Sequence, residues 1–267
     1  MTDSVSLSTR NGPFRVSLSG PEEGPVLILS NSLGTTLEMW EEQAAAFSST
    51  YRVVRYDTRG HGGSPVTPGP YTFDGLGDDV LAVMDALGIH RAAFCGISMG
   101  GHTALWLALH APERFTGVAV CNSAAKIGAA SAWEERAAAV RKDGVSAMKA
   151  LAESSPQRWF TDAFVQAEPQ KVAQAQSWIA GIHPEGYAAC CEALAQSDLR
   201  AELGRISIPV LLLAGESDPV TTVADAESMQ KAIAGSKIAT VPASHLSNLE
   251  APQAFDQALA AFLASLK

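Results

Sequence analysis

The sequence predicts an α/β fold with a doubly wound, mainly parallel sheet. Three observations support this class. Short apolar runs suited to buried strands recur along the 267 residues, helical patterns separate most of them, and an alternating hairpin pattern precedes them all. Strands that alternate with helices are typical of a parallel sheet with right-handed crossovers. The length fits one such domain with an insertion, or two small domains.

The first element is predicted to be an antiparallel hairpin. The stretches "SVSLS" and "FRVSLSG" both alternate between apolar and polar residues, and "TRNGP" lies between them. An Asn-Gly pair between alternating segments is a strong short-range hairpin signal.

Six further strands and five helices follow in near-regular alternation. Continuous apolar runs bounded by turn residues are typical of strands buried on both faces. The strands are expected at residues 25–30, 51–57, 91–96, 117–123, 209–215 and 236–242. The helices are expected at residues 36–47, 73–88, 100–115, 226–235 and 251–267.

The alternation breaks once, between Ala124 and about Ile206. This segment is helix-like, contains no convincing strand, and is punctuated by Pro156, Gly181 and Pro184. We interpret residues 124–206 as a helical cap inserted into a core of residues 1–123 and 207–267. A helical layer of the main domain is the alternative, although some eighty residues exceed a single crossover.

The composition limits which classes of partner the protein can bind and in which compartment it is expected. The formal net charge is −9 and no basic run occurs, which argues against a nucleic-acid partner. An anionic substrate would therefore need a local cation. Neither a secretory signal nor an apolar run of membrane-spanning length is recognised, so we expect a cytoplasmic protein. The four cysteines lack metal-site spacing and are expected to be buried, reduced thiols.

The stretch "CGISMGG" at residues 95–101 carries the main chemical signal. It fits G-x-S-x-G between a strand and a helix, the pattern of a nucleophile elbow. Gly96 and Gly100 allow the tight turn, and Ser98 is expected to project from the carboxyl edge of the sheet. The helix is expected to begin next to Ser98, so the backbone N–H of Met99 at its N-terminus can face an oxyanion.

An acid and a histidine follow in the order that this hypothesis requires. Asp218 comes after the strand "PVLLLAG", and His245 comes after the last strand. Glu216 is a weaker local rival of Asp218. Some α/β enzymes carry the acid one strand earlier, but that position is Asn122 here. Both side chains are expected at strand ends, where ligands bind in open α/β sheets.

The residue types suggest their roles. Neutral His245 accepts the Ser98 proton while Asp218 holds the imidazole tautomer. A second oxyanion donor is expected from the loop "SNSLGTT" after the first parallel strand, with the Leu33 amide as candidate beside the permissive Gly34.

His61, in the motif "YDTRGHGGS" at residues 56–64, is another candidate catalytic residue. Gly60, Gly62 and Gly63 mark a tight loop, so we expect His61 to be a structural histidine braced by its neighbours. The remaining histidines have no acid or cysteine at ligand spacing, and no metal site is expected.

With these residues assigned, the chain resembles the α/β-hydrolase superfamily over almost its full length. It is more closely similar to the 3-oxoadipate enol-lactonases of bacterial aromatic degradation. The closer likeness is carried by "SNSLGTTLEMW", where most of the superfamily has a His-Gly pair, by "CNSAAKIG" leading to "WEERAAAVRKDG", and by "RWFTDAF". The other two motifs, "YDTRGHGGS" and "GISMGGHTALWLALHAPERF", are shared by many relatives.

The resemblance implies hydrolysis of an enol-lactone that carries a free carboxylate, without a cofactor. It also implies that Ser98, Asp218 and His245 form the triad and that the Leu33 and Met99 amides form the oxyanion hole. The carboxylate needs a cation from the helical segment. The candidates are Arg136 beside Trp133, Arg158 and Lys126, and bidentate geometry favours the arginines.

Two rival functions stay open at this point. A carboxylesterase, a perhydrolase or another lactonase would share the fold and the triad, since neither fixes the substrate. The other rival is a small-molecule receptor that retains the triad. Such a receptor would hydrolyse its ligand so slowly that each molecule acts on little more than one ligand. Serine at the elbow argues against dehalogenases and epoxide hydrolases, which need a carboxylate nucleophile.

Overall fold

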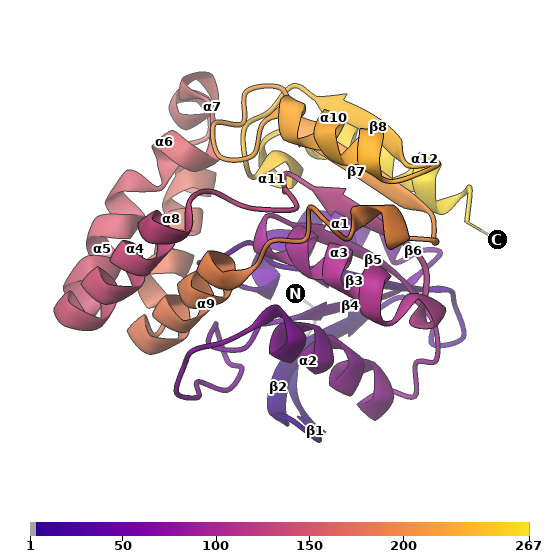
Figure 1. Ribbon diagram of the computed structural model, residues 1–267, viewed down its shortest axis with the longest axis horizontal. Helices are drawn as coiled ribbons and strands as arrows, with labels where there is room; N and C mark the ends of the chain where they lie inside the picture. The colour runs from indigo at the N-terminus through magenta and orange to yellow at the C-terminus, as the bar shows by residue number, and fades with distance from the viewer. Residues whose placement is uncertain (1–3, 267) are drawn as a thin grey trace.

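A computed structural model describes residues 4–266 and contains an eight-stranded sheet in the order β1-β2-β4-β3-β5-β6-β7-β8 (Figure 1). The strands are β1 (Ser4–Thr9), β2 (Gly12–Ser19), β3 (Val26–Ser30), β4 (Arg52–Tyr56), β5 (Ala92–Ile97), β6 (Phe115–Cys121), β7 (Val210–Gly215) and β8 (Lys237–Val241).

The predicted strand pattern is confirmed. β1 and β2 form an antiparallel hairpin closed at the pair Thr9 and Gly12, and β2 pairs antiparallel with β4. All other neighbours are parallel, from β4 to β8. β5 and β7 are buried along their whole length, which explains their continuous apolar sequences.

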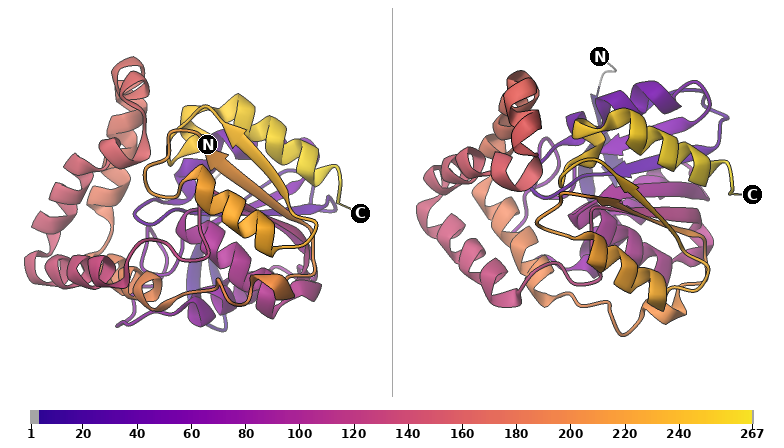
Figure 2. Two further views of the ribbon diagram at one scale, coloured as in Figure 1. Left: turned by 45° about the horizontal axis from the view of Figure 1, so that its top comes forward. Right: turned by 90° about the horizontal axis from the view of Figure 1, so that it is seen from above.

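Helices cover both faces of the sheet (Figure 2). The buried clusters place α2 (Phe73–Ala86), α3 (Met99–His110) and α10 (Val223–Ala232) on one face. They place α1 (Glu41–Phe47) and α12 (Pro252–Leu263) on the other. Four short elements complete this part: η1 (Leu37–Trp40), η2 (Pro112–Arg114), η3 (Leu203–Arg205) and α11 (Ser247–Glu250).

Capping residues set the helix boundaries. Thr72 accepts a hydrogen bond from the Gly75 amide and begins α2, as its sequence pattern predicts. α10 begins three residues earlier than the apolar pattern indicates, at Val223, because Thr222 and Asp225 form a reciprocal capping box. Polar capping chemistry therefore overrides the apolar pattern at this helix.

The segment between β6 and β7 is entirely helical within its regular elements. Before η3 it contains α4 (Ala130–Asp143), α5 (Val145–Ser154), α6 (Pro156–Trp159), α7 (Asp162–Ala167), α8 (Pro169–Gly181) and α9 (Pro184–Gln196). Figures 1 and 2 show these helices grouped beside the sheet, and we call them the helical insertion. Its buried residues join the core on the α1 and α12 face. The division into domains at residues 124 and 206 stays a prediction.

Within residues 4–266, every helix is too short or too polar to cross a lipid bilayer.

Candidate active site

Ser98 lies in the sharp turn between β5 and α3. Its backbone φ of 56° and ψ of −114° form an outlier conformation for a residue with a side chain. The Ser98 amide donates to the carbonyl oxygens of Cys121 and Asn122 at 3.0 and 3.1 Å. The Ser98 carbonyl accepts from the Ser123 hydroxyl at 2.7 Å. These bonds hold the strained turn and leave the Ser98 side chain lining a cavity.

The two glycines flanking Ser98 are required by close backbone contacts. A Cβ atom on Gly96 would lie 2.1 Å from the Gly100 carbonyl oxygen. A Cβ atom on Gly100 would lie 2.3 Å from the Ser30 carbonyl oxygen. The reason predicted for these glycines, that side chains must be absent on both sides of the turn, is therefore confirmed.

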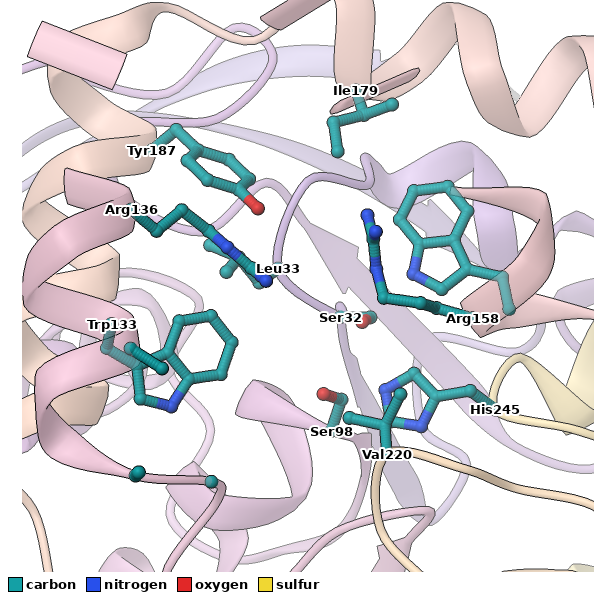
Figure 3. Close-up of a pocket in the computed structure, with 14 residues that line it drawn as sticks. Ser32, Leu33, Ser98, Trp133, Arg136, Arg158, Ile179, Tyr187, Val220 and His245 are labelled. Atoms are coloured by element: carbon teal, nitrogen blue, oxygen red, sulfur yellow. The ribbon is translucent and has the colours of Figure 1, made fainter. Parts of the chain in front are cut away.

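His245 and Asp218 meet at the ends of neighbouring strands β8 and β7. The Nδ1 atom of His245 lies 2.8 Å from Oδ2 of Asp218, and both side chains are buried. Figure 3 shows the other ring nitrogen directed toward the Ser98 side of the cavity. An Nδ1–H that donates to the carboxylate leaves Nε2 with its lone pair, the tautomer of a general base.

The Asp218 carboxylate is held by several further donors. Oδ1 accepts from the amides of Val220 and Thr221 at 2.8 and 3.1 Å. Oδ2 accepts from the Thr221 hydroxyl at 2.9 Å and from Nδ2 of Asn122 at 3.0 Å. Burial raises the pKa of Asp218, but the charge of a protonated His245 and these hydrogen bonds outweigh it, so the pKa lies below its ordinary value. Asp218 is therefore ionised at neutral pH.

Two backbone amides near Ser98 have no competing acceptor. The loop after β3 brings Leu33 to the cavity. The Gly34 amide donates to Nε2 of His61 at 3.0 Å, and the Thr35 amide donates to the Ser32 carbonyl oxygen at 3.2 Å. Within residues 4–266 the Leu33 and Met99 amides donate to no other group. Both N–H groups are therefore available to an anionic oxygen formed beside Ser98.

His61 holds this loop and does not reach the cavity. It is 1% exposed, and its Nδ1 lies 3.3 Å from the Arg59 carbonyl oxygen. Burial lowers the pKa of His61 to about 4, so the ring is neutral and Nε2 accepts from Gly34. The expectation of a structural histidine is confirmed.

A cavity of about 180 Å³ lies over Ser98 and His245, between the strand ends and the helical insertion (Figure 3). The core contributes Ser32, Leu33, Val220 and the two residues already named. Among the residues lining it from the segment between β6 and β7 are Trp133, Arg136, Arg158, Trp159, Ile179 and Tyr187. The volume suits a small metabolite.

Two arginines give this cavity a positive wall. The Arg136 guanidinium lies 4.8 Å from the centre of the Trp133 ring, and Arg158 donates to the Ser154 hydroxyl at 3.3 Å. Neither arginine forms a salt bridge with an acid in the described part of the chain. Burial lowers the pKa of Arg158, and the charge of Arg136 lowers it further. A carboxylate placed between the two guanidinium groups would supply a counter-charge and so offset both causes of the lowered pKa.

The structure leaves two sequence candidates away from the cavity. Lys126 does not line it, and its Nζ atom lies 3.7 Å from Asp198. Glu216 is exposed and accepts from the Thr240 hydroxyl at 3.2 Å, away from His245.

Sequence reasoning also missed residues that the fold brings to the site. Ile179 and Tyr187 line the cavity from α8 and α9, and Asn122 contacts Asp218. The signal in the sequence for Asn122 is its place at the end of a predicted strand, where some α/β enzymes carry the acid. Within residues 4–266 no group of three His, Cys, Asp or Glu side chains is arranged to hold a metal ion.

Comparisons with known proteins agree with this geometry. The sequence profile of the family described as alpha/beta hydrolase fold matches residues 25–252. A protein of Acinetobacter baylyi named 3-oxoadipate enol-lactonase 2 is 49% identical, over 97% of this chain and 96% of its own length. A second protein of that organism, 3-oxoadipate enol-lactonase 1, is 45% identical over 99% and 98% of the two chains.

A solved structure is also similar over nearly the whole chain. The enol-lactonase from Burkholderia xenovorans superposes with a TM-score of 0.94 at 41% identity, covering 98% of this chain and all of that one.

Proposed function

The chain belongs to the α/β-hydrolase fold family, and we propose that it is a serine hydrolase that opens the lactone ring of 3-oxoadipate enol-lactone to give 3-oxoadipate. The observation that carries this choice is the pair of arginines, Arg136 and Arg158, in the cavity of Ser98 and His245. The names of the two Acinetobacter baylyi relatives and of the solved enol-lactonase support the same substrate.

Acylation begins with Ser98. His245 takes the hydroxyl proton as Ser98 Oγ attacks the lactone carbonyl carbon, and the Leu33 and Met99 amides stabilise the oxyanion. Ionised Asp218 stabilises the imidazolium that forms. The ring C–O bond then breaks, and the ring oxygen leaves as an enolate. The imidazolium of His245 gives this oxygen the proton taken from Ser98, which returns His245 to its neutral form. The resulting enol tautomerises to the ketone, so the leaving group is a good one.

Deacylation uses the same groups in reverse. His245 removes a proton from water, and the resulting hydroxide attacks the acyl carbon in the oxyanion site. The Ser98–acyl bond breaks, and Ser98 recovers its proton from His245. Water is the only co-reactant, and no metal or cofactor takes part in the proposal.

Arg136 and Arg158 serve as the binding site for the free carboxylate of the substrate. A guanidinium offers two parallel N–H donors to a carboxylate. Trp133 fixes Arg136 by stacking, and the Trp133 ring is itself anchored by its Nε1–H to the Ile127 carbonyl at 2.5 Å. Lys126 has no part in this clamp because it pairs with Asp198 outside the cavity.

The segment 124–206 acts as the cap that closes this cavity, and we place the reaction in the cytoplasm. All four cysteine thiols are free and buried, which supports a reducing compartment.

The test is steady-state hydrolysis of 3-oxoadipate enol-lactone, with phenyl acetate as a neutral ester. We expect fast lactone turnover, slow ester turnover, and loss of both in Ser98→Ala. Good ester turnover without lactone turnover would leave a serine esterase of another specificity. Undiminished lactone turnover by Ser98→Ala would refute the mechanism.

A further inference from the structure

Asn122 links the three segments that carry Ser98, Asp218 and His245. Its carbonyl oxygen accepts from the Ser98 amide at 3.1 Å. Its side-chain Nδ2 donates to Asp218 Oδ2 at 3.0 Å and to the Ser244 carbonyl at 3.1 Å, one residue before His245. Its Oδ1 accepts from the Ser247 hydroxyl, two residues after His245. Both ends of the side-chain amide are thus hydrogen-bonded. Each of its partners is Asp218 itself or a residue close to His245.

The backbone of Asn122 is held in an unusual conformation. The residue has a φ of +43° and is 1% exposed, and its amide donates to the Leu213 carbonyl at 2.7 Å. Left-handed conformations are unfavourable for most residues and persist where the surroundings fix them. Gly215 at the end of β7 leaves room for the side chain, since a Cβ atom there would lie 2.9 Å from Asn122 Nδ2.

We propose that Asn122 is a positioning residue for the hydrolytic reaction, orienting the Asp218 carboxylate toward His245 while bracing the loop on which His245 stands. This inference rests on the proposed function of Ser98, Asp218 and His245. Asp218 Oδ2 must receive the His245 N–H in the plane of the ring, and the Asn122 and Thr221 donors fix the rotation that allows it. Asn122 acts through Asp218 and does not touch the substrate cavity.

The chemistry of the position requires a neutral donor. A carboxylate at position 122 would have no hydrogen to offer to Asp218 or Ser244, and it would add a like charge beside Asp218. The charged groups around this cluster are His245, which contacts Asp218, and Glu250, which accepts from the Ser244 amide at 2.8 Å. Arg158 lines the same cavity as His245.

The test compares Asn122→Asp with Asn122→Gly. Aspartate keeps the shape and the acceptor for Ser247, whereas glycine keeps the left-handed backbone without strain. In both variants we expect kcat to fall about 10- to 100-fold, the range for losing a hydrogen bond to a charged group, while KM stays within about two-fold. In Asn122→Asp alone, the acid limb of the pH–rate profile moves to higher pH. The extra carboxylate favours the protonated imidazole, which cannot act as a base.

Asn248→Asp is the matched control for lost stability. Its buried amide donates to the Met39 carbonyl at 2.7 Å and to Gln43 at 3.1 Å, without contact to the triad side chains. This variant should unfold at lower temperature but keep the wild-type kcat and pH profile. Wild-type kcat and pH profile in Asn122→Asp, or a kcat loss no larger than in Asn248→Asp, would overturn the proposal.

A second readout separates this inference from the choice of substrate. Phosphorylation of Ser98 by diethyl 4-nitrophenyl phosphate releases 4-nitrophenol and reports the triad whether or not the lactone is turned over. Slower labelling of both Asn122 variants, with the shifted profile in Asn122→Asp, supports the positioning role even if wild type ignores the lactone. Unchanged labelling rates overturn it. A wild-type enzyme that neither hydrolyses the lactone nor is labelled would instead refute the proposed function itself.

Discussion

At the scale of single residues, charge and burial decide what the cavity binds. The chain carries a net charge of −9, yet two guanidinium groups without acidic partners in the described chain line the space above Ser98. Arg158 is held in this half-buried place although burial and the neighbouring Arg136 both lower its pKa. Such an arrangement favours an anionic ligand, because the ligand supplies the missing counter-charge.

Replacing either arginine should weaken substrate binding more than chemistry. For Arg136→Met and Arg158→Met we expect KM for the lactone to rise about 10- to 100-fold, since a charge-assisted hydrogen bond contributes about 1.5–3 kcal/mol. The kcat should change little, and phenyl acetate turnover should be unaffected. Initial rates over a range of substrate concentrations measure both constants.

Arg200→Met is the matched control for these variants. Arg200 is exposed and pairs with Asp198 on the surface, so its loss should leave KM unchanged. Equal KM values for Arg136→Met, Arg158→Met and Arg200→Met would contradict the carboxylate clamp.

At the scale of elements, the loop before α11 is tied to the helical insertion. Glu250 accepts from the Ser244 amide at 2.8 Å and from the Thr161 amide at 3.2 Å, and it also accepts from the Thr161 hydroxyl. The Leu246 amide donates to the Trp159 carbonyl at 3.0 Å. The segment that bears His245 is thereby fixed to the segment that bears Arg158.

Removing this tie should affect both stability and catalysis. Glu250→Ala leaves the amide of buried Ser244 and that of half-buried Thr161 without an acceptor, so we expect the free energy of unfolding to fall by about 1–3 kcal/mol. The kcat/KM for the lactone should fall as well, because His245 and Arg158 lose their fixed separation. Urea unfolding and lactone kinetics measure the two effects.

Lys171→Ala tests whether any contact between α8 and the core has this effect. Lys171 pairs with Glu42 at 2.7 Å on the surface, and exposed pairs of this kind contribute under about 1 kcal/mol. Loss of kcat/KM in Lys171→Ala as large as in Glu250→Ala would show that the tie through Glu250 is not special.

At the scale of the whole molecule, two buried neutral histidines link stability to pH. His61 accepts from the Gly34 amide, and His102 bonds the Ala124 carbonyl at 2.8 Å and the Ser197 hydroxyl at 2.7 Å. Burial lowers the pKa of each to about 4, whereas the unfolded chain binds the proton near pH 6.5. Their contribution is present above pH 6.5 and is lost as the pH falls toward 4.

Acidification should therefore destabilise the protein before Asp218 is protonated. Between pH 6.5 and 5 we expect each histidine to reduce the free energy of unfolding by up to about 1.4 kcal/mol per pH unit. The pKa of Asp218 is lowered, so its contribution is lost only at still lower pH. Urea unfolding at several pH values measures the slope, and His102→Gln should make it shallower. An equal slope in wild type and His102→Gln would rule out this source of the acid sensitivity.

Local patterns in the sequence determined most of the architecture and the order of the site residues. The apolar runs placed the strands, and the Asn-Gly turn placed the hairpin. The steric demand of the turn at Gly96 and Gly100 placed Ser98 at a strand end, with Asp218 and His245 after later strands. These features follow from side-chain periodicity and backbone sterics within a few residues, which a linear sequence contains in full.

Only the tertiary structure decided which distant side chains meet. It paired Asn122 with Asp218, ninety-six positions later in the chain, and brought Arg136 and Arg158 over the cavity while leaving Lys126 with Asp198. Such contacts depend on the pairing of β6 with β7 and on how the helical insertion packs against the strand ends. No local periodicity encodes that packing, because it results from burial of apolar surface contributed by the whole chain.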